Sequence, residues 1–315
     1  MKQKNKAILG HLSDMDIRLL QIFKAVVECG GFSSAELELN ISISTISRHI
    51  KDLETRLGFT LCQRGRSGFA LSTQGQQVYN ETLRLLGAIN DFRASIDDVH
   101  ARLGGELHVA VFEKITGNPN SRLPQTVADF TRLAPDVLIN LHVRPINEIE
   151  RGVLDGQYHI GIIPDHRPSN SLRYEPLFHE DMKLYCGESH PLYHKNTASL
   201  DWSDIRAFAL AGLAYHSPNM EVSHRAKLSR RANAYDQEGV ATFILSGKFI
   251  GFLPTHYALN FENQGSMRAV NPDRFQYRVE FFAIQPRTKN GSRAVELFHD
   301  CLRKAHSTSS VRAIL

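Results

Sequence analysis

The chain has 315 residues, of which 42% are hydrophobic and 22% charged, and its formal net charge is +4 at pH 7. This composition is ordinary for a globular protein of two or three domains. No stretch is apolar enough to span a membrane, and residues 7–9 are the only apolar run near the start, so we expect neither an anchor nor a signal peptide and predict a cytoplasmic protein.

Residues 32–58 predict two helices joined by a tight turn. Ser33 and Glu36 have the S-x-x-E form of a capping box, which predicts the start of a short helix. Its apolar positions are Ala35, Leu37 and Leu39. Ser42 is predicted to cap a second helix that ends at Gly58. The second helix has one apolar stripe, formed by Ile43, Ile46, Ile50, Leu53 and Leu57.

Hydrogen-bonding and basic side chains on the other face of the second helix describe a helix-turn-helix that enters a DNA groove. The alternative is a helical hairpin with a solvated face. The β-prone residues 59–62 and 69–71 flank a turn with Arg64 and Arg66, and predict a wing whose arginines meet phosphates or the minor groove. The residues expected to bind DNA are Ser33, Ser42, Ser44, Thr45, Arg48, His49, Lys51, Arg64 and Arg66.

At this point the sequence resembles the LysR-type transcriptional regulators. The resemblance rests on a set of residues at fixed spacing, namely Phe32, Ala35, Leu39, the run 42–50 with Ser47 and Arg48, Leu53, Glu54, Leu57, Gly58, Leu61, Arg64, and residues 71–75 in the family's L-[ST]-x-x-G form. It implies a winged head, a linker helix and an effector domain similar to periplasmic binding proteins. It also implies a ligand-responsive, sequence-specific regulator that acts as a dimer of dimers.

Thr73 and Gln76 have the T-x-x-Q capping form and predict a long helix that ends near residue 104. Apolar positions recur along it at spacings of four and three, at Val78, Thr82, Leu85, Ile89, Phe92, Ile96, Val99 and Leu103. This repeat is typical of a coiled-coil seam. We therefore expect dimerisation through Leu85, Ile89, Phe92 and Ile96. The alternative is an amphipathic helix packed on its own domain.

From residue 106 onward, strands and helices alternate. Strands are expected at 107–111, 138–143, 160–163, 183–186, 208–211, 249–253 and 278–284, and helices at 123–133, 147–154, 240–245 and 292–304. This rhythm predicts parallel sheet with helices on both faces, in two α/β units joined by two crossovers. A binding cleft is expected between the units, at the carboxyl ends of the strands.

The predicted fold class is therefore α/β with an N-terminal winged helix-turn-helix and a long linker helix. We expect a DNA-binding domain at 12–72, a linker at 73–104 and an effector domain at 105–306. Its first subdomain would span 105–164 and 270–306, and its second 165–269. The residues expected to line the effector cleft are Phe112, Lys114, Thr116, Ile146, Asn147, Pro164, Tyr215, Asp236 and Phe252.

Departures from the family pattern limit what the resemblance implies. The recognition helix of the family usually continues after its capping Ser with a Gln, which could read adenine, and here Ile43 stands there, so base contacts are expected from Ser44, Thr45 and Arg48. Phe112 stands where the family often has Ser, and Ile146 where it often has Ser or Thr. The predicted pocket is accordingly apolar, while Lys114, Asn147 and the helix N-termini could hold an anion, which favours a small carboxylate effector. The alternative is that Lys114 points to solvent.

No enzyme motif, phosphate-binding loop or metal-ligand pattern is present, and Glu113, Asp165 and Asp236 form no evident catalytic pair. The sequence therefore predicts no catalytic residues, metal or cofactor. Two rivals to a regulator are a periplasmic-type binding module and a cytosolic enzyme. The expected partners are double-stranded DNA, a small-molecule effector, further copies of the chain and RNA polymerase, with no membrane.

Overall fold

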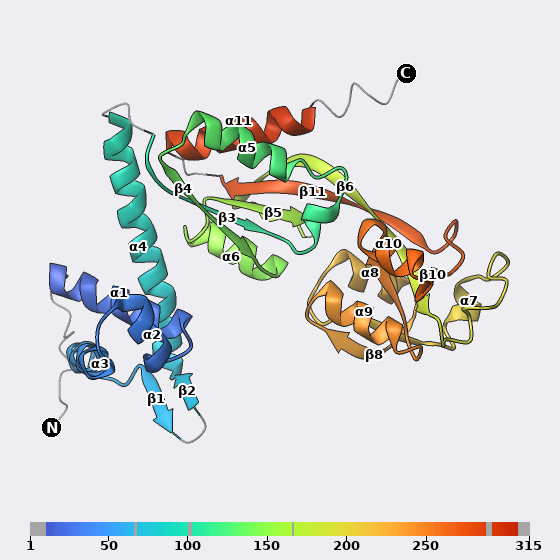
Figure 1. Cartoon of the computed structure of the whole chain (residues 1–315), viewed down its shortest axis with the longest axis horizontal. Helices are drawn as coiled ribbons and strands as arrows, with labels where there is room; N and C mark the ends of the chain where they lie inside the picture. Colours follow the sequence, from blue (N-terminus) through green and yellow to red (C-terminus); the bar gives the residue numbers. More distant parts are fainter. Residues whose placement is uncertain (1–10, 66–67, 100–102, 166, 288–291, 308–315) are drawn as a thin grey trace. The chain divides into compact units, whose positions relative to one another are not determined.

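The structure, a computed structural model, describes residues 11–65, 68–99, 103–165, 167–287 and 292–307. The chain divides into two compact units, one that ends at Asn90 and one that begins at Asp91 (Figure 1). The first unit holds a helical head with a small hairpin, and the second holds one mixed sheet with its helices. Within the described ranges, no helix combines the length and the apolar character needed to cross a membrane.

The head consists of three helices and a two-stranded hairpin around one small core. Its elements are α1 (Asp14–Glu28), α2 (Phe32–Leu39), α3 (Ile43–Leu57), β1 (Cys62–Gly65) and β2 (Gly68–Leu71). The three helices meet through apolar side chains that include Leu19, Phe23, Val26, Phe32, Ala35, Ile46, Ile50 and Leu53. The winged helix-turn-helix predicted from the sequence is therefore present.

A buried carboxylate ties α1 to α3. Asp16 is fully buried, and it accepts hydrogen bonds from the amide and the hydroxyl of Ser13, at 2.8 and 2.6 Å, which completes a capping box. The Arg56 guanidinium, on α3, donates to the same carboxylate at 2.9 Å. The hydroxyl of Ser13 is the largest cause that lowers the pKa of Asp16, and Arg56 adds to it. Charge-assisted bonds of this kind hold the two helices in one geometry.

The start of α2 differs from the prediction. The helix begins at Phe32 after Gly31, and no side chain caps it. Gly31 has a φ of 150°, a conformation that favours glycine, so the chain turns two residues before Ser33 and leaves its hydroxyl inside the first turn. Glu36 instead accepts a hydrogen bond from the amide of Ile43. Leu37, predicted as an apolar core position, is 87% exposed.

The wing and the long helix α4 (Thr73–Val99) also begin elsewhere than predicted. The amides of Leu61 and Cys62 donate to the Glu54 carboxylate, at 2.7 and 3.4 Å, so the strand ladder starts at Cys62 and not at residue 59. Ser72 caps α4 in place of Thr73. Its hydroxyl accepts from the amide of the third helical residue at 2.8 Å and donates to the carbonyl of residue 60.

The apolar positions of α4 lie in two different environments. Thr82 is 2% exposed, while Val78 and Leu85 pack against the core of the head. These positions, predicted as part of a seam between copies, therefore contribute to their own head, because the first turns of α4 lie against it. Phe92 and Ile96, further along, are 66% and 44% exposed. They leave an apolar stripe that the single chain does not cover.

The second unit is built on one mixed sheet with the strand order β4-β3-β5-β11-β6-β9-β7-β8, and β10 pairs with β6. Its strands are β3 (Gly105–Val111), β4 (Val137–Val143), β5 (Ile160–Pro164), β6 (Leu172–Gly187), β7 (Ala209–Leu213), β8 (Ser229–Ala234), β9 (Ile250–Pro254), β10 (Met267–Ala269) and β11 (Gln276–Pro286). Each flank of the sheet is a parallel group of three strands. The long antiparallel strands β6 and β11 join the groups, as the two predicted crossovers.

Helices cover both faces of each flank. In the first subdomain, α5 (Leu123–Leu133) and α11 (Arg293–Ser307) lie together on one face, and α6 (Ile146–Leu154) lies on the other (Figure 1). The second subdomain carries α7 (Trp202–Ile205), α8 (Pro218–Arg225), α9 (Gln237–Leu245) and α10 (Thr255–Asn263). The predicted α/β architecture is confirmed. The prediction missed α7, α8, α10, β8, β10 and the 3-10 turn η1 (Ile115–Gly117), and it included only the end of β6.

Candidate DNA-binding and effector-binding sites

The cap and the buried stripe of α3 decide which of its faces meets solvent. The Ser42 hydroxyl accepts from the amide of Thr45 at 3.3 Å, and Gly58 ends the helix with a φ of 80°. The apolar stripe then turns inward, with Ile46, Ile50 and Leu53 at most 1% exposed, as predicted, whereas Ile43, also predicted in the stripe, is 38% exposed because it lies in the first turn beside the cap. The opposite face is consequently fixed toward solvent.

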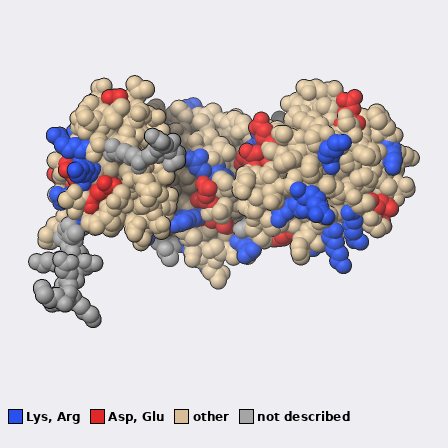
Figure 2. Space-filling view, turned by 90° about the horizontal axis from the view of Figure 1, so that it is seen from below, with Lys and Arg blue, Asp and Glu red and all other residues tan. Residues whose placement is uncertain are grey.

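That outer face carries Ser44, Arg48 and Lys51, all exposed, with Thr45 and His49 half-buried beside them. Figure 2 shows Lys and Arg side chains gathered at the end of the N-terminal unit where α3 lies in Figure 1. Guanidinium and hydroxyl groups on one helix face can donate to base edges in the major groove, and ammonium groups pair with phosphates. The geometry is therefore that of a helix able to read a groove.

The remaining residues expected at the DNA lie outside this face. Ser33 is exposed on the first turn of α2. Arg64 belongs to β1, but its side chain is not among those described, and Arg66 lies outside the described residues. Each of these residues stays a prediction.

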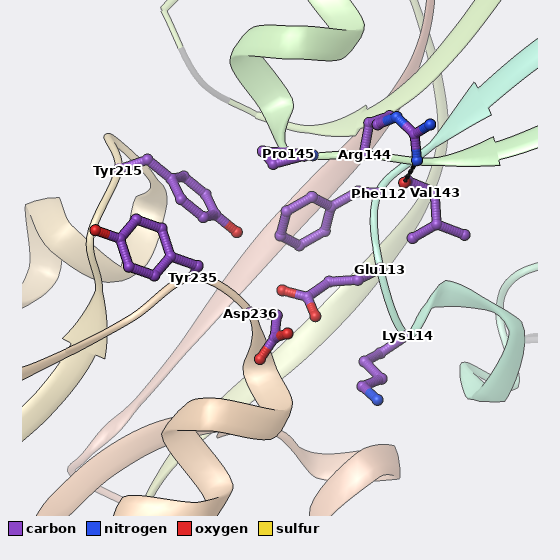
Figure 3. A pocket seen from close by; sticks show the side chains of 9 residues that line it. All are labelled: Phe112, Glu113, Lys114, Val143, Arg144, Pro145, Tyr215, Tyr235 and Asp236. Carbon is purple, nitrogen blue, oxygen red and sulfur yellow. Dashed lines mark hydrogen bonds between the residues drawn. The ribbon is translucent and has the colours of Figure 1, made fainter. Parts of the chain in front are cut away.

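The second unit has a cavity of about 490 Å³ between its two subdomains (Figure 3). The first subdomain contributes Phe112, Glu113, Lys114, Val143, Arg144 and Pro145, and the second contributes Tyr215, Tyr235 and Asp236. These residues follow the ends of β3, β4, β7 and β8, so the cavity lies at the carboxyl ends of the parallel strands, where α/β sheets bind ligands.

A carboxyl group from one subdomain binds the start of a helix in the other. Both oxygens of Glu113 accept from the amide of Gln237, at 2.9 Å, and Asp236 caps the same helix, α9, by accepting from the amide of Gly239 at 2.7 Å. In Figure 3 the carboxylates of Glu113 and Asp236 lie close together. Burial, and then the negative charge of Asp236, raises the pKa of Glu113 to about 7.

Lys114 is not a free cation. Its ammonium lies 3.1 Å from the carboxylate of Glu238, on α9, and 4.7 Å from the centre of the Tyr257 ring. Its backbone has a φ of 61°, and its carbonyl accepts from His256 Nε2 at 3.0 Å if that nitrogen carries the proton. The side chain therefore points to a partner in the other subdomain, rather than to solvent or to an open anion site.

Comparisons with known proteins cover most of the chain. The family description "LysR substrate binding domain" matches residues 100–307, and "Bacterial regulatory helix-turn-helix protein, lysR family" matches residues 17–76. BauR of Pseudomonas aeruginosa, an HTH-type transcriptional activator, is 39% identical over 298 residues, which cover 95% of this chain and 98% of BauR.

The chain belongs to the LysR family of transcriptional regulators.

Solved structures agree on the fold. The crystal structure of CbnR, a LysR family transcriptional regulator, has a TM-score of 0.64 at 21% identity, over 92% of this chain and 99% of CbnR. Full-length CbnR complexed with its target DNA gives 0.62 at 20% identity, over the same shares. As a LysR regulator, the chain combines a DNA-binding head with a domain for small-molecule effectors, as its sequence predicts.

The structure brings only some of the predicted effector residues to the LysR cleft. Phe112, Lys114, Tyr215 and Asp236 line the large cavity, and Phe112, Ile146 and Pro164 line a smaller one beside it. Three others line neither cavity. Thr116 and Asn147 are exposed, and Phe252 is fully buried, with its carbonyl accepting from an Asn219 amide. Thr116, in the 3-10 turn Ile115–Gly117, and Asn147, in the first turn of α6, belong to the surface, and Phe252, in β9, belongs to the core.

The acidic character of the cleft was not predicted from the sequence. Nothing in the sequence indicated that Glu113 and Asp236 lie together, yet these residues, 123 positions apart, share one helix start. One signal was present, since Glu113 directly follows a strand whose carboxyl end should face a cleft. Glu180, Gln237 and Tyr277, which line the smaller cavity, gave no such signal.

Proposed function

We propose that the chain is a ligand-responsive, sequence-specific regulator of transcription, in which a small molecule in the cleft changes how its heads engage DNA. The observation that carries this proposal is the presence, in one chain, of an exposed polar and basic face on α3 and a cavity of about 490 Å³ between two subdomains. BauR, named as a transcriptional activator, and CbnR, solved with its target DNA, support the same use of the head.

Two contacts across the cleft are the elements that a ligand would act on. Glu113 binds the first amide of α9, and Lys114 pairs with Glu238 on the same helix. A molecule that competes for these groups would change the separation of the subdomains. Such closure bends a few connecting residues, and here β6 and β11 are the only strands that link the two parallel groups of the described sheet.

The other parts of the proposal concern partners. The exposed Phe92 and Ile96 of α4 favour assembly into dimers, and dimers of dimers would place several heads on one DNA. A regulator that raises transcription also meets RNA polymerase in the cytoplasm. We assign the chain no catalytic step, since its family consists of transcriptional regulators.

Replacing Arg48 should weaken binding to the specific site and barely affect binding to other DNA. We expect Arg48→Ala to lower specific affinity by about 1–3 kcal/mol, roughly five- to 150-fold, because a guanidinium at a base edge discriminates between sequences. Arg64→Ala, on the wing, should instead weaken binding to all DNA and reduce the salt slope by about one unit. Gel-shift titrations at several salt concentrations measure both effects.

The matched control is Arg231→Ala, which removes the same charge from an exposed position of β8 in the other unit. It should bind DNA like the wild type. If Arg48→Ala and the wild type bind the DNA upstream of the chain's own gene with equal affinity, α3 is not the helix that reads the DNA sequence.

A further inference from the structure

The cleft has an inner end that its larger cavity does not include. A second cavity, of about 20 Å³, shares Phe112 with the first and is lined by residues of both subdomains and both crossover strands. Glu180 comes from β6, Tyr277 from β11 and Gln237 from the start of α9. A space of this size holds about one water molecule, or one polar group of similar size at the end of a ligand.

Three polar atoms in this lining are buried without a hydrogen-bond partner. They are Oε1 of Glu180, Oε1 of Gln237 and the hydroxyl of Tyr277. Glu180 and Gln237 are only 4% and 2% exposed. The imidazole Nε2 of His256 lies 3.7 Å from Glu180, beyond hydrogen-bond distance, and burial lowers the pKa of that imidazole. Buried polar atoms are ordinarily satisfied, so three atoms that can each accept a hydrogen bond around one space, with the Tyr277 hydroxyl also able to donate, indicate an absent polar partner.

The place at Lys114 where the sequence suggested an anion is already taken by side chains of the second subdomain. Glu238 pairs with Lys114, and Glu113 and Asp236 occupy the free amides at the start of α9. Figure 3 shows the two carboxylates together, with Lys114 directed away from them. The cleft therefore offers carboxyl groups and acceptor oxygens toward its interior, which favours a cation.

We propose that the effector carries a primary ammonium group, which donates hydrogen bonds to Glu180, Gln237 and Tyr277, while the rest of the molecule lies in the outer cavity against Phe112 and Tyr215. An ammonium has three donors and no acceptor, which matches three unsatisfied acceptors. A carboxylate would bring only acceptors to the same space and could not satisfy the carbonyl oxygen of Gln237. This inference rests on the proposed function, because it names the chemical class bound in the same cleft.

Binding of an ammonium should displace a proton. Burial, and then the negative charges of Glu113 and Asp181, raises the pKa of Glu180 to about 8, and the other groups facing it are His256 and the Tyr277 hydroxyl. Near neutral pH the carboxyl of the empty cleft is therefore mostly protonated, and an ammonium binds its ionised form. The affinity for the amine should rise with pH up to about 8 and then level off.

The test uses three five-carbon probes with the full chain: pentylamine, 5-aminopentanoate and pentanoate, at constant ionic strength. In thermal-shift and calorimetric titrations, both amines should stabilise the protein and pentanoate should not. Glu180→Gln, which keeps the size and removes the charge, should lower amine affinity at least tenfold and abolish proton release. Tyr277→Phe removes only the hydroxyl and should weaken binding several-fold, which gives a second reading if Glu180→Gln folds poorly.

The matched control is Glu188→Gln, at an exposed position just beyond β6 that lines neither cavity, and it should bind amines like the wild type. Stabilisation by pentanoate equal to that by 5-aminopentanoate would overturn the proposal. So would failure of both amines to bind, or wild-type amine affinity in Glu180→Gln and Tyr277→Phe. DNA binding is measured in parallel and separates the two proposals. If one of these results is obtained while DNA binding is intact, the ammonium proposal is wrong and the proposed regulatory function still stands.

Discussion

Gly75→Ala should destabilise the head by about 3 kcal/mol or more, at the upper end of what overpacking costs. A Cβ at this position would lie 1.9 Å from the carbonyl oxygen of Leu61, which is far inside van der Waals contact. In an unconstrained helix the same change would stabilise by about 1 kcal/mol. The sign of the effect therefore depends on whether residue 61 can move.

Hydrogen bonds on both sides of Leu61 prevent that movement. Its amide donates to the Glu54 carboxylate at 2.7 Å, its carbonyl accepts from the amide of Ser72 at 2.9 Å, and its side chain is fully buried. Ser72 in turn caps α4, because its hydroxyl accepts from the amide of Gly75 itself. Relieving the overlap would break the cap, the start of the wing or both, so the position requires glycine.

Circular dichroism during heating measures the effect, and the melting transition of the head should fall by about 10 °C or more. Specific DNA binding should be lost at temperatures where the wild type still binds. Gln76→Ala, at the exposed neighbouring position, is the control and should melt like the wild type. A Gly75→Ala protein as stable as the wild type would contradict the packing described here.

Phe92→Asp should abolish dimerisation through α4. Phe92 is 66% exposed in the single chain, and Ile96, one turn further along, is 44% exposed. If two copies pack on this stripe, the variant buries two like charges without partners, a costly arrangement in a helical seam. DNA binding should then fall by about two to four orders of magnitude, because the two heads no longer bind as one molecule.

Light scattering gives the mass of the assembly, and circular dichroism shows whether the second unit stays folded. Asn90→Asp adds the same charge on the opposite face of α4 from Phe92 and should assemble like the wild type. If Phe92→Asp also assembles like the wild type, Phe92 is not part of the interface.

Residue type and spacing predicted the structure correctly where interactions between residues close in the sequence determine it. The cap Ser42, the stop Gly58 and the stripe Ile46, Ile50 and Leu53 all follow from spacing and residue type, and α3 adopts them. Capping patterns failed at Ser33 and Thr73. At these two helices, the turn at Gly31 and the cap Ser72, whose hydroxyl donates to the carbonyl of residue 60, determine where the helix begins.

The candidate effector site was less predictable because distant segments build it. Phe112 was expected in the cleft because it follows a predicted strand, and Asp236 was also among the expected cleft residues; both line the cavity. The partner of Lys114 is 124 positions away, so its apparent availability for an anion could not be judged from the sequence. The polar strand Ser229–Ala234 has no apolar alternation, and its neighbours in the sheet alone make it a strand.

The central claim is that this LysR family member binds a specific DNA site. The most direct measurement is a titration of the full chain against DNA upstream of its own gene and against unrelated DNA of equal length, at several salt concentrations. We expect affinity for the upstream DNA to exceed that for unrelated DNA by at least about a thousandfold, and both to fall as salt rises. Equal affinity for the two DNAs at every salt concentration would contradict the claim.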